Sequence, residues 1–435
     1  MMGTGLRPGA IGVDLGTSGC RAVALAGDGV TLAEARRPLA PQIRDWEGGS
    51  EQVPALWWDA VTAVLRDLAP ALAGQGPPRV CVAGTSATVL LATEIGEPLS
   101  PALMYDDSRS RSEAAMIAAC APADSPALGA GSSLSKALYL QRRLPGRGPR
   151  LAMHQADWIL GRLTGRYGLS DWNNCLKLGY DPSAGAWPAW LDRLGLDGLV
   201  LPKVLPPGAV VAPLCRAALA ATGLPAGSLA LAGTTDSTAA VIAAGARRPG
   251  DAVTCLGSTL VLKVISERPV SASRYGVYSH RLGDIWIIGG ASNTGGAVLR
   301  RYFDDGSLRR LSAALDPDRP TGLDYYPLLA PGERFPLADP HLAPRLTPRP
   351  EDARTFLQGL LEGMARIEAQ GYELLRDLGA PAVGAVLSIG GGAQNQAWTR
   401  IRARALGVPV VVAQVQEAAF GAARLALGAG SGLGP

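Results

Sequence analysis

The stretch AIGVDLGTSGCRAVAL, residues 10–25, decides the fold. Two runs of apolar β-formers flank a short turn of Gly, Thr and Ser, and this pattern predicts a β-hairpin. A related stretch, AVTCLGSTLVLKVIS, follows at residues 252–266, with LGST in the place of LGTS. We therefore predict a weak internal repeat with a spacing of about half the chain.

The chain has 435 residues, too many for one ordinary hydrophobic core, and about two domains are expected. Strand-like runs alternate with helical patterns such as residues 53–72, which indicates α/β layers. The proline-rich stretch LPKVLPPGAVVAPL, residues 201–214, suggests the end of the first domain's helical region. We place the domain boundary near residue 230.

Charge and composition argue against several classes of partner. The 41 basic and 37 acidic residues are spread along the chain without a polybasic run, so nucleic acid is not an expected partner. The first ten residues lack the features of a secretion signal, and no uncharged apolar run reaches membrane-spanning length. We expect a cytoplasmic protein without a membrane partner, present as a monomer or homodimer.

The first hairpin has the chemistry of an anion site. Gly16 and Gly19 let backbone N–H groups approach a phosphate, and Thr17 and Ser18 add hydroxyl donors. Asp14 ends the first strand beside this turn, where an ionised carboxylate could bind Mg²⁺ through water, or a substrate hydroxyl. The alternative is an ordinary hairpin whose aspartate caps the turn.

The second hairpin lacks the acid, because Cys255 stands in the place of Asp14. The segment GTTDS, residues 233–237, can supply it, since Asp236 precedes an apolar helical run. A helix N-terminus favours the ionised carboxylate and keeps it available as a base for phosphoryl transfer. The alternative is that Asp236 is only the helix N-cap.

A glycine-rich loop, GGGAQN at residues 390–395, follows a predicted strand and precedes a helix that ends at Gly407. Its glycines allow the backbone to lie close to a nucleotide. Neither G-x-G-x-x-G nor G-x-x-x-x-G-K-[ST] occurs, which argues against a dinucleotide-binding fold and against a P-loop.

Taken in order along the chain, these motifs resemble those of the FGGY carbohydrate kinases. The motifs are DLGTSG at 14–19, GTTDS at 233–237, LGST at 256–259 and GGGAQN at 390–395. The resemblance implies two actin-like (ribonuclease H-like) ATPase domains of the α/β class with a central cleft. A sugar-binding domain at 8–230 and an ATP-binding domain at 231–430 are implied, with ATP and Mg²⁺ as cofactors.

Within the family the chain is most similar to the D-ribulose kinases of cyanobacteria and plant plastids. That similarity lies in SDWNNCLKLGYD at 170–181, GVYSH at 276–280 and GLDYYPLLAPGERFPLADP at 322–340. It implies phosphorylation of D-ribulose to D-ribulose 5-phosphate. The alternatives are a kinase for xylulose, ribitol or glycerol, a conformational ATPase of the actin or chaperone type, and a catalytically silent binding protein.

The resemblance also implies roles for individual residues. Asp236 matches the catalytic base, Asp14 matches the aspartate that contacts sugar and hydrated Mg²⁺, and Thr17 would help to place the γ-phosphate. The implied sugar contacts are Asp14, Ser18, Gly19, Cys20, Arg21, Ser86 and Asp236. The implied ATP contacts are Gly257, Gly295, Gly391, Gly392, Ala393, Gln394 and Asn395. Each of these is otherwise a turn glycine or a capping group.

One further segment, MYDDSR at residues 104–109, resembles the W-x-D-x-R segment that many FGGY kinases use near the sugar. Tyr105 stands at the aromatic position, so the tryptophan is absent. For Asp107 and Arg109 two interpretations stay open, which are contact with the sugar and a mutual surface ion pair.

Overall fold

The computed structural model describes residues 8–146 and 148–428, and the chain divides into two compact units. Unit 1 runs to Ala243 and adds His280–Asp284 and the segment that begins at Glu417. Unit 2 holds Ala244–Ser279 and Ile285–Gln416. Units defined by packing can draw segments from both sides of an inherited domain boundary, so the boundary near residue 230 stays a prediction.

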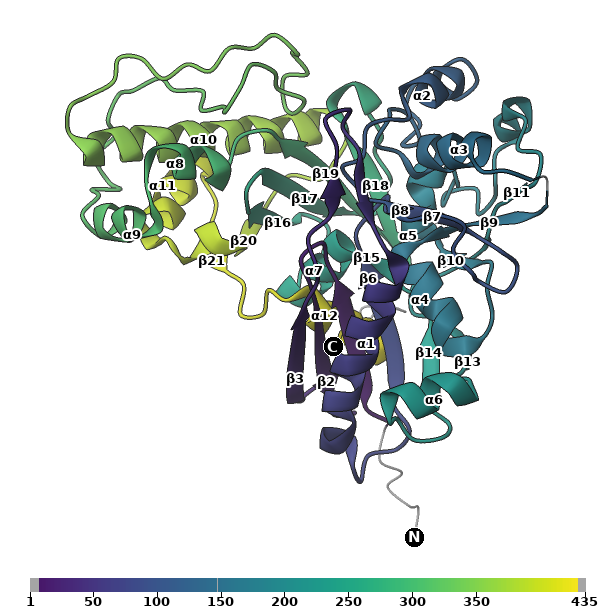
Figure 1. The fold of residues 1–435 in the computed structure, drawn as a ribbon. Coiled ribbons are helices and arrows are strands. Elements are labelled where there is room, and N and C mark those ends of the chain that lie inside the picture. Colours follow the sequence, from purple (N-terminus) through teal and green to yellow (C-terminus); the bar gives the residue numbers. More distant parts are fainter. Residues whose placement is uncertain (1–7, 147, 429–435) are drawn as a thin grey trace. The chain divides into compact units, whose positions relative to one another are not determined.

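The main sheet of unit 1 has the strand order β13-β14-β6-β1-β2-β3, with β15 also paired to β6 (Figure 1). The first hairpin is confirmed, because β1 pairs antiparallel with β2, and β1 also pairs parallel with β6. The strands are β1 Ala10–Leu15, β2 Gly19–Leu25, β3 Thr31–Pro38, β6 Arg79–Gly84, β13 Val210–Pro213, β14 Leu229–Leu231 and β15 Thr234–Thr235.

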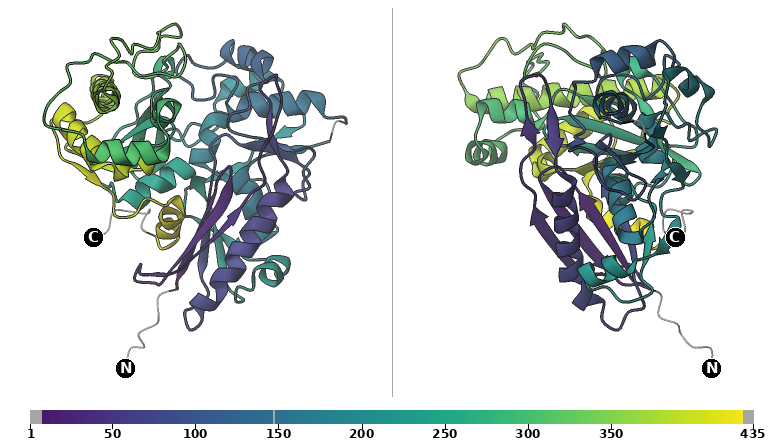
Figure 2. Two further views of the ribbon diagram at one scale, coloured as in Figure 1. Left: turned by 60° about the vertical axis from the view of Figure 1, so that its left-hand side comes forward. Right: turned by 45° about the vertical axis from the view of Figure 1, so that its right-hand side comes forward.

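Helix α1, Pro54–Leu68, covers one face of this sheet, and both views of Figure 2 show it lying along the purple strands. Side chains of β1 alternate between the two faces because a strand has a period of two. Trp57 of α1 is fully buried in the same apolar cluster as one set of β1 side chains. That set is Ile11, Val13 and Leu15.

Helix α12, Ala418–Ala426, packs against β1 at the other set of positions. A Cβ atom added to Gly12 would lie 1.9 Å from the carbonyl oxygen of Ala419, so only glycine allows this approach. The same helix meets α7, Asp236–Ala244, where a Cβ on Gly421 would lie 1.8 Å from the carbonyl oxygen of Ala239. Small residues therefore allow α12 to pack closely against β1 and α7 in unit 1.

The rest of unit 1 contains a second sheet of order β11-β9-β7-β8-β5-β4 and the pair β10-β12. These strands are β4 Ile43–Arg44, β5 Ser50–Gln52, β7 Val89–Ala92, β8 Ala102–Leu103, β9 Arg150–His154, β10 Leu169–Asp171, β11 Leu199–Val200 and β12 Lys203–Leu205. The helices are η1 Ala69–Leu72, α2 Arg111–Ala118, α3 Ser133–Arg143, α4 Gln155–Thr164, α5 Trp172–Cys175, η2 Leu176–Leu178, η3 Ala189–Leu194 and α6 Arg216–Thr222.

The strands of unit 2 form a sheet of order β19-β17-β16-β20-β21. Its hairpin β16-β17 is antiparallel and β16 pairs parallel with β20, which is the arrangement of β1, β2 and β6 in unit 1. The predicted repeat is therefore present in the fold. These strands are β16 Asp251–Leu256, β17 Leu260–Ser266, β19 Ile285–Ser292, β20 Ala385–Ile389 and β21 Val410–Val412, and most of β18, Tyr278–Leu282, belongs to unit 1.

A buried polar network joins the centre of unit 2. Glu368 accepts hydrogen bonds from Arg402 Nε and Nη2, each at 2.6 Å, and from Thr254 Oγ1 at 2.6 Å. Arg402 Nη1 also donates to Ser388 Oγ at 2.7 Å. Thr254 lies on β16 and Ser388 lies on β20. The network therefore fixes the strand that leads into the turn of the second hairpin and the strand that leads into the glycine-rich loop.

The helices of unit 2 surround this sheet and include one long element, α10. They are η4 Ser273–Tyr275, α8 Gly296–Tyr302, α9 Asp305–Ala313, α10 Ala353–Asp377, η5 Gly391–Gln394 and α11 Gln396–Leu406. The predicted strand, glycine-rich loop and helix ending at Gly407 are confirmed. Across the described residues, no helix combines the length and apolarity needed to cross a membrane.

Candidate active site

Asp14 and Asp236 lie at the carboxyl ends of parallel strands in the main sheet of unit 1. Strand β1 places Asp14 level with Ala83 of β6, and β15 places Thr234 level with the same Ala83 from the other side. All three strands run parallel, so their carboxyl ends coincide. The two aspartates, which are far apart in the sequence, therefore lie on either side of the end of β6.

The environment of Asp14 is that of a buried acid beside other acids. Its residue is 8 % exposed, and burial together with the charge of Asp236 raises its pKa to about 7. Arg21 opposes this shift, with Nη1 at 3.6 Å from Asp14 Oδ2, whereas Glu417 adds to it. A cation or a hydroxyl donor placed at these carboxylates would relieve the repulsion.

Asp236 is the first residue of α7 and is partly buried. The side chain of Thr235 caps the helix, since Thr235 Oγ1 accepts the N–H of Thr238 at 3.4 Å. Asp236 Oδ1 accepts the N–H of Ser237 at 2.6 Å. The interpretation of Asp236 as the N-cap is therefore wrong, and its carboxylate lies in the first turn, where the helix dipole favours negative charge.

The turn of the first hairpin is held from behind by side chains. Gly16 N–H donates to the carbonyl oxygen of Gly19 at 2.9 Å, which closes the turn. Gln52 Nε2 donates to the Thr17 carbonyl oxygen at 3.3 Å, and Trp57 Nε1 donates to Gln52 Oε1 at 2.7 Å. Gln52 was not predicted, although it stands in the EQVPALWW segment directly before α1.

The remaining predicted sugar contacts differ in their exposure. Ser18 and Arg21 are exposed, and Ser86 is partly buried in the turn that follows β6. The next residue, Ala87, has a left-handed φ of 65°, which is uncommon without a glycine. Cys20 is fully buried in the apolar core, so its thiol is not available to a sugar in this structure.

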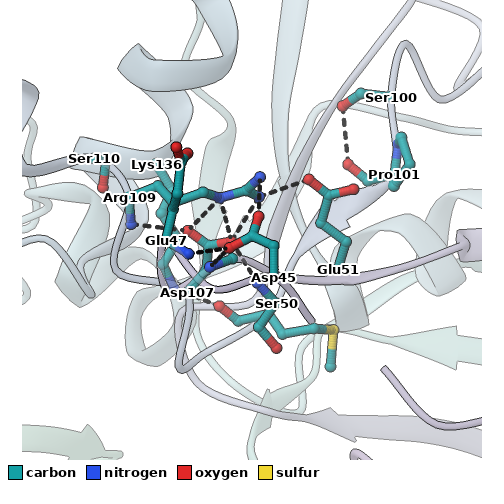
Figure 3. Close-up of polar contacts among 12 residues, drawn as sticks. Asp45, Glu47, Ser50, Glu51, Ser100, Pro101, Asp107, Arg109, Ser110 and Lys136 are labelled. Carbon is teal, nitrogen blue, oxygen red and sulfur yellow. Dashed lines mark hydrogen bonds and ion pairs between the residues drawn. The ribbon is translucent and has the colours of Figure 1, made fainter. Parts of the chain in front are cut away.

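Asp107 and Arg109 form an ion pair, but it is buried and not on the surface. The Asp107 side chain is 0 % exposed and accepts the N–H of Ser50 at 2.8 Å. Arg109 Nη2 lies 2.7 Å from Asp107 and 2.6 Å from Glu51, and its Nη1 lies 3.4 Å from Asp45 (Figure 3). The prediction of a surface pair is therefore wrong, and both charges are engaged within the fold.

Tyr105 lies at the open side of the same segment and is 47 % exposed. Burial and then Asp106 raise the pKa of its phenol, and the charge of Asp236 contributes as well. Tyr105 therefore offers an accessible phenol at the position where the resemblance expects an aromatic residue.

A cavity of about 560 Å³ lies within unit 2, beside the second hairpin and the glycine-rich loop. Its volume falls in the range of small-molecule sites. It is lined by Leu256, Gly257, Ser258, Gly296, Leu299, Arg300, Asp305, Leu308, Arg309, Ser312, Ala313, Gly391, Gly392, Gln394, Asn395, Gln396, Ala397 and Trp398. Four of the predicted ATP contacts besides Gly257 therefore lie together here: Gly391, Gly392, Gln394 and Asn395.

Gly391 and Gly392, which are neighbours in the glycine-rich loop, differ in the space around them. A Cβ on Gly391 would meet nothing within 4 Å, so this residue leaves free space beside the cavity. A Cβ on Gly392 would lie 2.6 Å from the Trp398 ring and 2.8 Å from Leu256 Cβ, so this glycine is required for packing.

Three other predicted ATP contacts have structural duties. Gly295, with φ of 144°, packs against the second hairpin, where a Cβ would lie 2.6 Å from the Ser258 carbonyl oxygen. Ala393 is 1 % exposed and belongs to the core, so its side chain does not face the cavity. Asn395 caps α11 through Oδ1 and donates from Nδ2 to Ser312 Oγ at 2.9 Å.

A linear array of Ser133, His154 and Asp157 resembles a hydrolase triad only in its distances. His154 Nε2 lies 3.1 Å from Ser133 Oγ, and His154 Nδ1 lies 2.7 Å from Asp157 Oδ2. All three residues are at most 2 % exposed, so no substrate reaches the serine. His154 and Asp157 form the capping box of α4, and the Ser133 hydroxyl lies within hydrogen-bond distance of the second ring nitrogen of His154.

The carboxylates present fit a divalent cation that brings most of its own ligands. Within the described ranges, no group of three or more His, Cys, Asp or Glu side chains could hold a metal ion. Burial and the neighbouring charge of Asp236 raise the pKa of Asp14, and both effects would be offset by one positive charge placed at this carboxylate. Mg²⁺ commonly binds one or two carboxylates together with phosphate oxygens and water, which matches this donor set.

Solved structures share the fold of this chain over almost its full length. A xylulose kinase from Rhodospirillum rubrum aligns with a TM-score of 0.84 and 26 % identity, covering 98 % of this chain and 91 % of that one. A Plasmodium falciparum glycerol kinase with ADP aligns with a TM-score of 0.83 and 16 % identity, covering 96 % and 89 %. The predicted α/β fold of two actin-like ATPase domains is confirmed.

Sequence comparison gives the same result. A xylulose kinase from Streptomyces coelicolor is 29 % identical over 438 residues, which cover 96 % of this chain and 87 % of the relative. A glycerol kinase from Gloeobacter violaceus is 26 % identical over 465 residues, covering 97 % and 88 %. Residues 10–243 match the N-terminal domain of the FGGY family of carbohydrate kinases, and residues 252–429 match its C-terminal domain. The chain therefore belongs to the FGGY family of carbohydrate kinases, enzymes that use ATP to phosphorylate a sugar or polyol.

Proposed function

We propose that this enzyme transfers the γ-phosphoryl group of MgATP to a hydroxyl of a ketopentose, with D-xylulose as the first candidate acceptor. The observation that carries the proposal is the pair Asp14 and Asp236 at a common sheet edge. The choice of D-xylulose is supported by relatives named xylulose kinase, five of which match 96 % of this chain.

D-ribulose, which the sequence motifs favoured as the acceptor, is now the second candidate. One contact supports it as an alternative acceptor. Asn173, in the SDWNNCLKLGYD segment, donates from Nδ2 to Thr234 Oγ1 at 3.1 Å, two residues before Asp236. The segment that carries the D-ribulose resemblance therefore supports the strand that presents the candidate base.

In the proposed reaction Asp236 accepts the proton of the attacking sugar hydroxyl. Its place in the first turn of α7 keeps the carboxylate ionised and available. MgATP supplies the electrophilic phosphorus and the positive charge that offsets the developing negative charge. Asp14 becomes ionised when that charge arrives, and its carboxylate then orients the substrate side of the reaction.

Other groups of the chain bind and orient the reactants. The turn that begins at Gly16, with the Thr17 hydroxyl, offers donors to the transferred phosphoryl group. Ser18, Arg21 and Ser86 are proposed to contact the sugar. In unit 2, the cavity beside Gly257 and Gly391 is proposed to hold the nucleotide.

The direct test is a coupled ADP-release assay with MgATP and D-xylulose, D-ribulose, ribitol, glycerol or no acceptor. We expect release to depend on a ketopentose, with kcat/KM highest for D-xylulose. A highest value for D-ribulose would promote the second candidate, and a highest value for glycerol or ribitol would refute a ketopentose acceptor. Equal ADP release with and without acceptor would refute the kinase proposal in favour of a conformational ATPase.

A further inference from the structure

Lys136 on α3 is a fully buried lysine for which the proposed reaction has no use, and burial lowers the pKa of its amine to about 7. Its Nζ donates to the carbonyl oxygen of Ala87 at 2.9 Å and to that of Met104 at 2.7 Å. A buried amine is unfavourable unless polar groups satisfy it. Because an apolar side chain would serve the packing of this helix, packing alone does not explain a lysine bound to two main-chain carbonyls.

The two carbonyls belong to two different loops of unit 1. Ala87 follows Ser86 in the turn after β6, and its left-handed φ of 65° fixes the direction in which that turn leaves the strand. Met104 follows β8 and directly precedes Tyr105, the residue at the aromatic position of the W-x-D-x-R-like segment. One lysine therefore joins the loop of a predicted sugar contact to the loop that carries this aromatic residue.

Each loop is also anchored separately. Gln155 Oε1 accepts from the N–H and the hydroxyl of Thr85, both at 3.0 Å, which holds the first loop. Arg109 holds the second loop through its ion pair with Asp107 (Figure 3). Its guanidinium also lies 5.5 Å from the centre of the Tyr139 ring, and Tyr139 lies about one helical turn after Lys136 on α3. These contacts fix each loop to its surroundings, whereas Lys136 bonds to both loops at once.

We propose that Lys136 is a positioning residue for the sugar subsite, fixing the spacing between Ser86 and Tyr105. The proposal rests on the proposed function, because it assumes that both residues border the acceptor. Without the lysine amine, two buried carbonyl oxygens lose their shared donor, and the loops become free to separate. The sugar would then bind between poorly fixed walls, while the nucleotide cavity in unit 2 keeps its own supports.

The variants Lys136→Met and Lys136→Gln test this role. Methionine keeps the length of the side chain without a donor, and glutamine offers an amide that can serve one carbonyl. A matched control is Arg150→Met, since Arg150 is 6 % exposed and also binds main-chain carbonyls, those of Gln141, Leu144, Pro145 and Gly146. None of these four is a predicted site residue.

All proteins are compared at a temperature at which circular dichroism shows each to be folded. For Lys136→Met we expect KM for the ketopentose to rise about tenfold or more while KM for ATP changes less than about twofold, with a smaller effect for Lys136→Gln. Amide hydrogen exchange should accelerate at residues 85–88 and 104–106 together. In Arg150→Met, faster exchange should be confined to residues 141–150, with both KM values kept.

Unchanged KM for the sugar in both Lys136 variants, or an equal rise of both KM values, would overturn the proposal. So would unchanged exchange in the two loops. If the unmodified enzyme phosphorylates no acceptor, the proposed function fails, and the exchange experiment alone then decides whether Lys136 joins the loops.

Discussion

Asp14 on β1 and Arg21 on β2 are register partners across the first hairpin, with Arg21 Nη1 3.6 Å from Asp14 Oδ2. The same Nη1 lies 3.7 Å from Glu417 Oε2, so one exposed guanidinium is shared by two acids. Burial and the charge of Asp236 both raise the pKa of Asp14, and because the arginine offsets only part of this effect, that pKa reaches about 7. This arrangement has a measurable cost in stability.

The first prediction concerns pH. The folded state binds the Asp14 proton more tightly than the unfolded state, so this stabilisation is complete below about pH 4 and is lost as the pH rises through about 7. The variant Asp14→Asn lacks this loss. We compare the free energy of unfolding of Asp14→Asn with that of the parent protein, both without substrates. We expect this difference to shift in favour of the variant by roughly 2–4 kcal/mol between pH 4 and pH 8.

Urea denaturation at pH 4, 6 and 8 measures this difference. Asp171, whose pKa burial also raises to about 7, gives a slope of the same sign that remains in both proteins and cancels in the comparison. Equal pH dependence in the two proteins would contradict the assignment of a raised pKa to Asp14.

The second prediction concerns the base. Asp236→Asn should lower kcat for sugar-dependent ADP release by about 10²–10⁴-fold, because the amide cannot accept the hydroxyl proton. ADP affinity, measured by calorimetry, should not change, since the nucleotide cavity is built from residues of unit 2. Ser237→Ala, one residue further along α7, is the control and should retain turnover. Near-normal kcat in Asp236→Asn would remove this residue from the role of base.

The third prediction separates two adjacent glycines. Gly391→Ala adds a methyl group where nothing lies within 4 Å, so the melting temperature should be kept while KM for ATP rises about tenfold. Gly392→Ala forces a methyl group against Leu256 and Trp398 and should cost about 1–3 kcal/mol of stability. An unchanged KM for ATP in Gly391→Ala would show that the nucleotide does not use that space.

The fourth prediction concerns the buried pair of unit 2. Glu368→Gln leaves the Arg402 guanidinium, which is 0 % exposed, without its countercharge and should cost about 3–5 kcal/mol. Asp377→Asn removes the acid of an exposed pair with Arg376 on the same helix and should change stability by less than about 1 kcal/mol. Chemical denaturation of both variants tests the contrast, and equal losses would contradict it.

The fifth prediction concerns the seat of α12. Gly12→Ala places a Cβ 1.9 Å from the Ala419 carbonyl oxygen, which neither backbone can avoid, so we expect a loss of about 1–3 kcal/mol or more. Gly76→Ala in the same unit meets only Pro8 at 3.8 Å and serves as the control. A melting temperature for Gly12→Ala equal to that of the control would show that α12 moves aside without cost.

The sequence predicted those features that depend on local patterns. Both hairpins and the glycine-rich loop with its helix were found because alternating apolar residues, turn residues and a terminal glycine lie within short stretches. Asp14 and Asp236 were proposed from the chemistry of their own segments, and the family resemblance gave them complementary roles. No spacing rule could place them together, because their proximity depends on both β1 and β15 pairing with β6 in register.

What escaped prediction lies in contacts between distant segments. For Arg109 the sequence left open a sugar contact and a surface ion pair, but Glu51 and Asp45 bind it from the segment around β5 and hold it within the fold. Lys136 gave no signal, because a lysine in an amphipathic helix is normally exposed, and only the packing of two loops over α3 reveals its partners. The sequence also could not show that Thr235, and not Asp236, caps the start of α7, because this depends on side-chain geometry.

The position of α12 sets an order of events during biosynthesis. Strand β1 is synthesised before unit 2, but the helix that covers Gly12 is made only after all of unit 2. The apolar face formed by Ala10, Cys81 and Ala83 must stay uncovered, or be protected by a chaperone, while unit 2 is synthesised. We therefore expect unit 2 to complete its fold before unit 1, which reverses the usual N-terminal-first order of a growing chain.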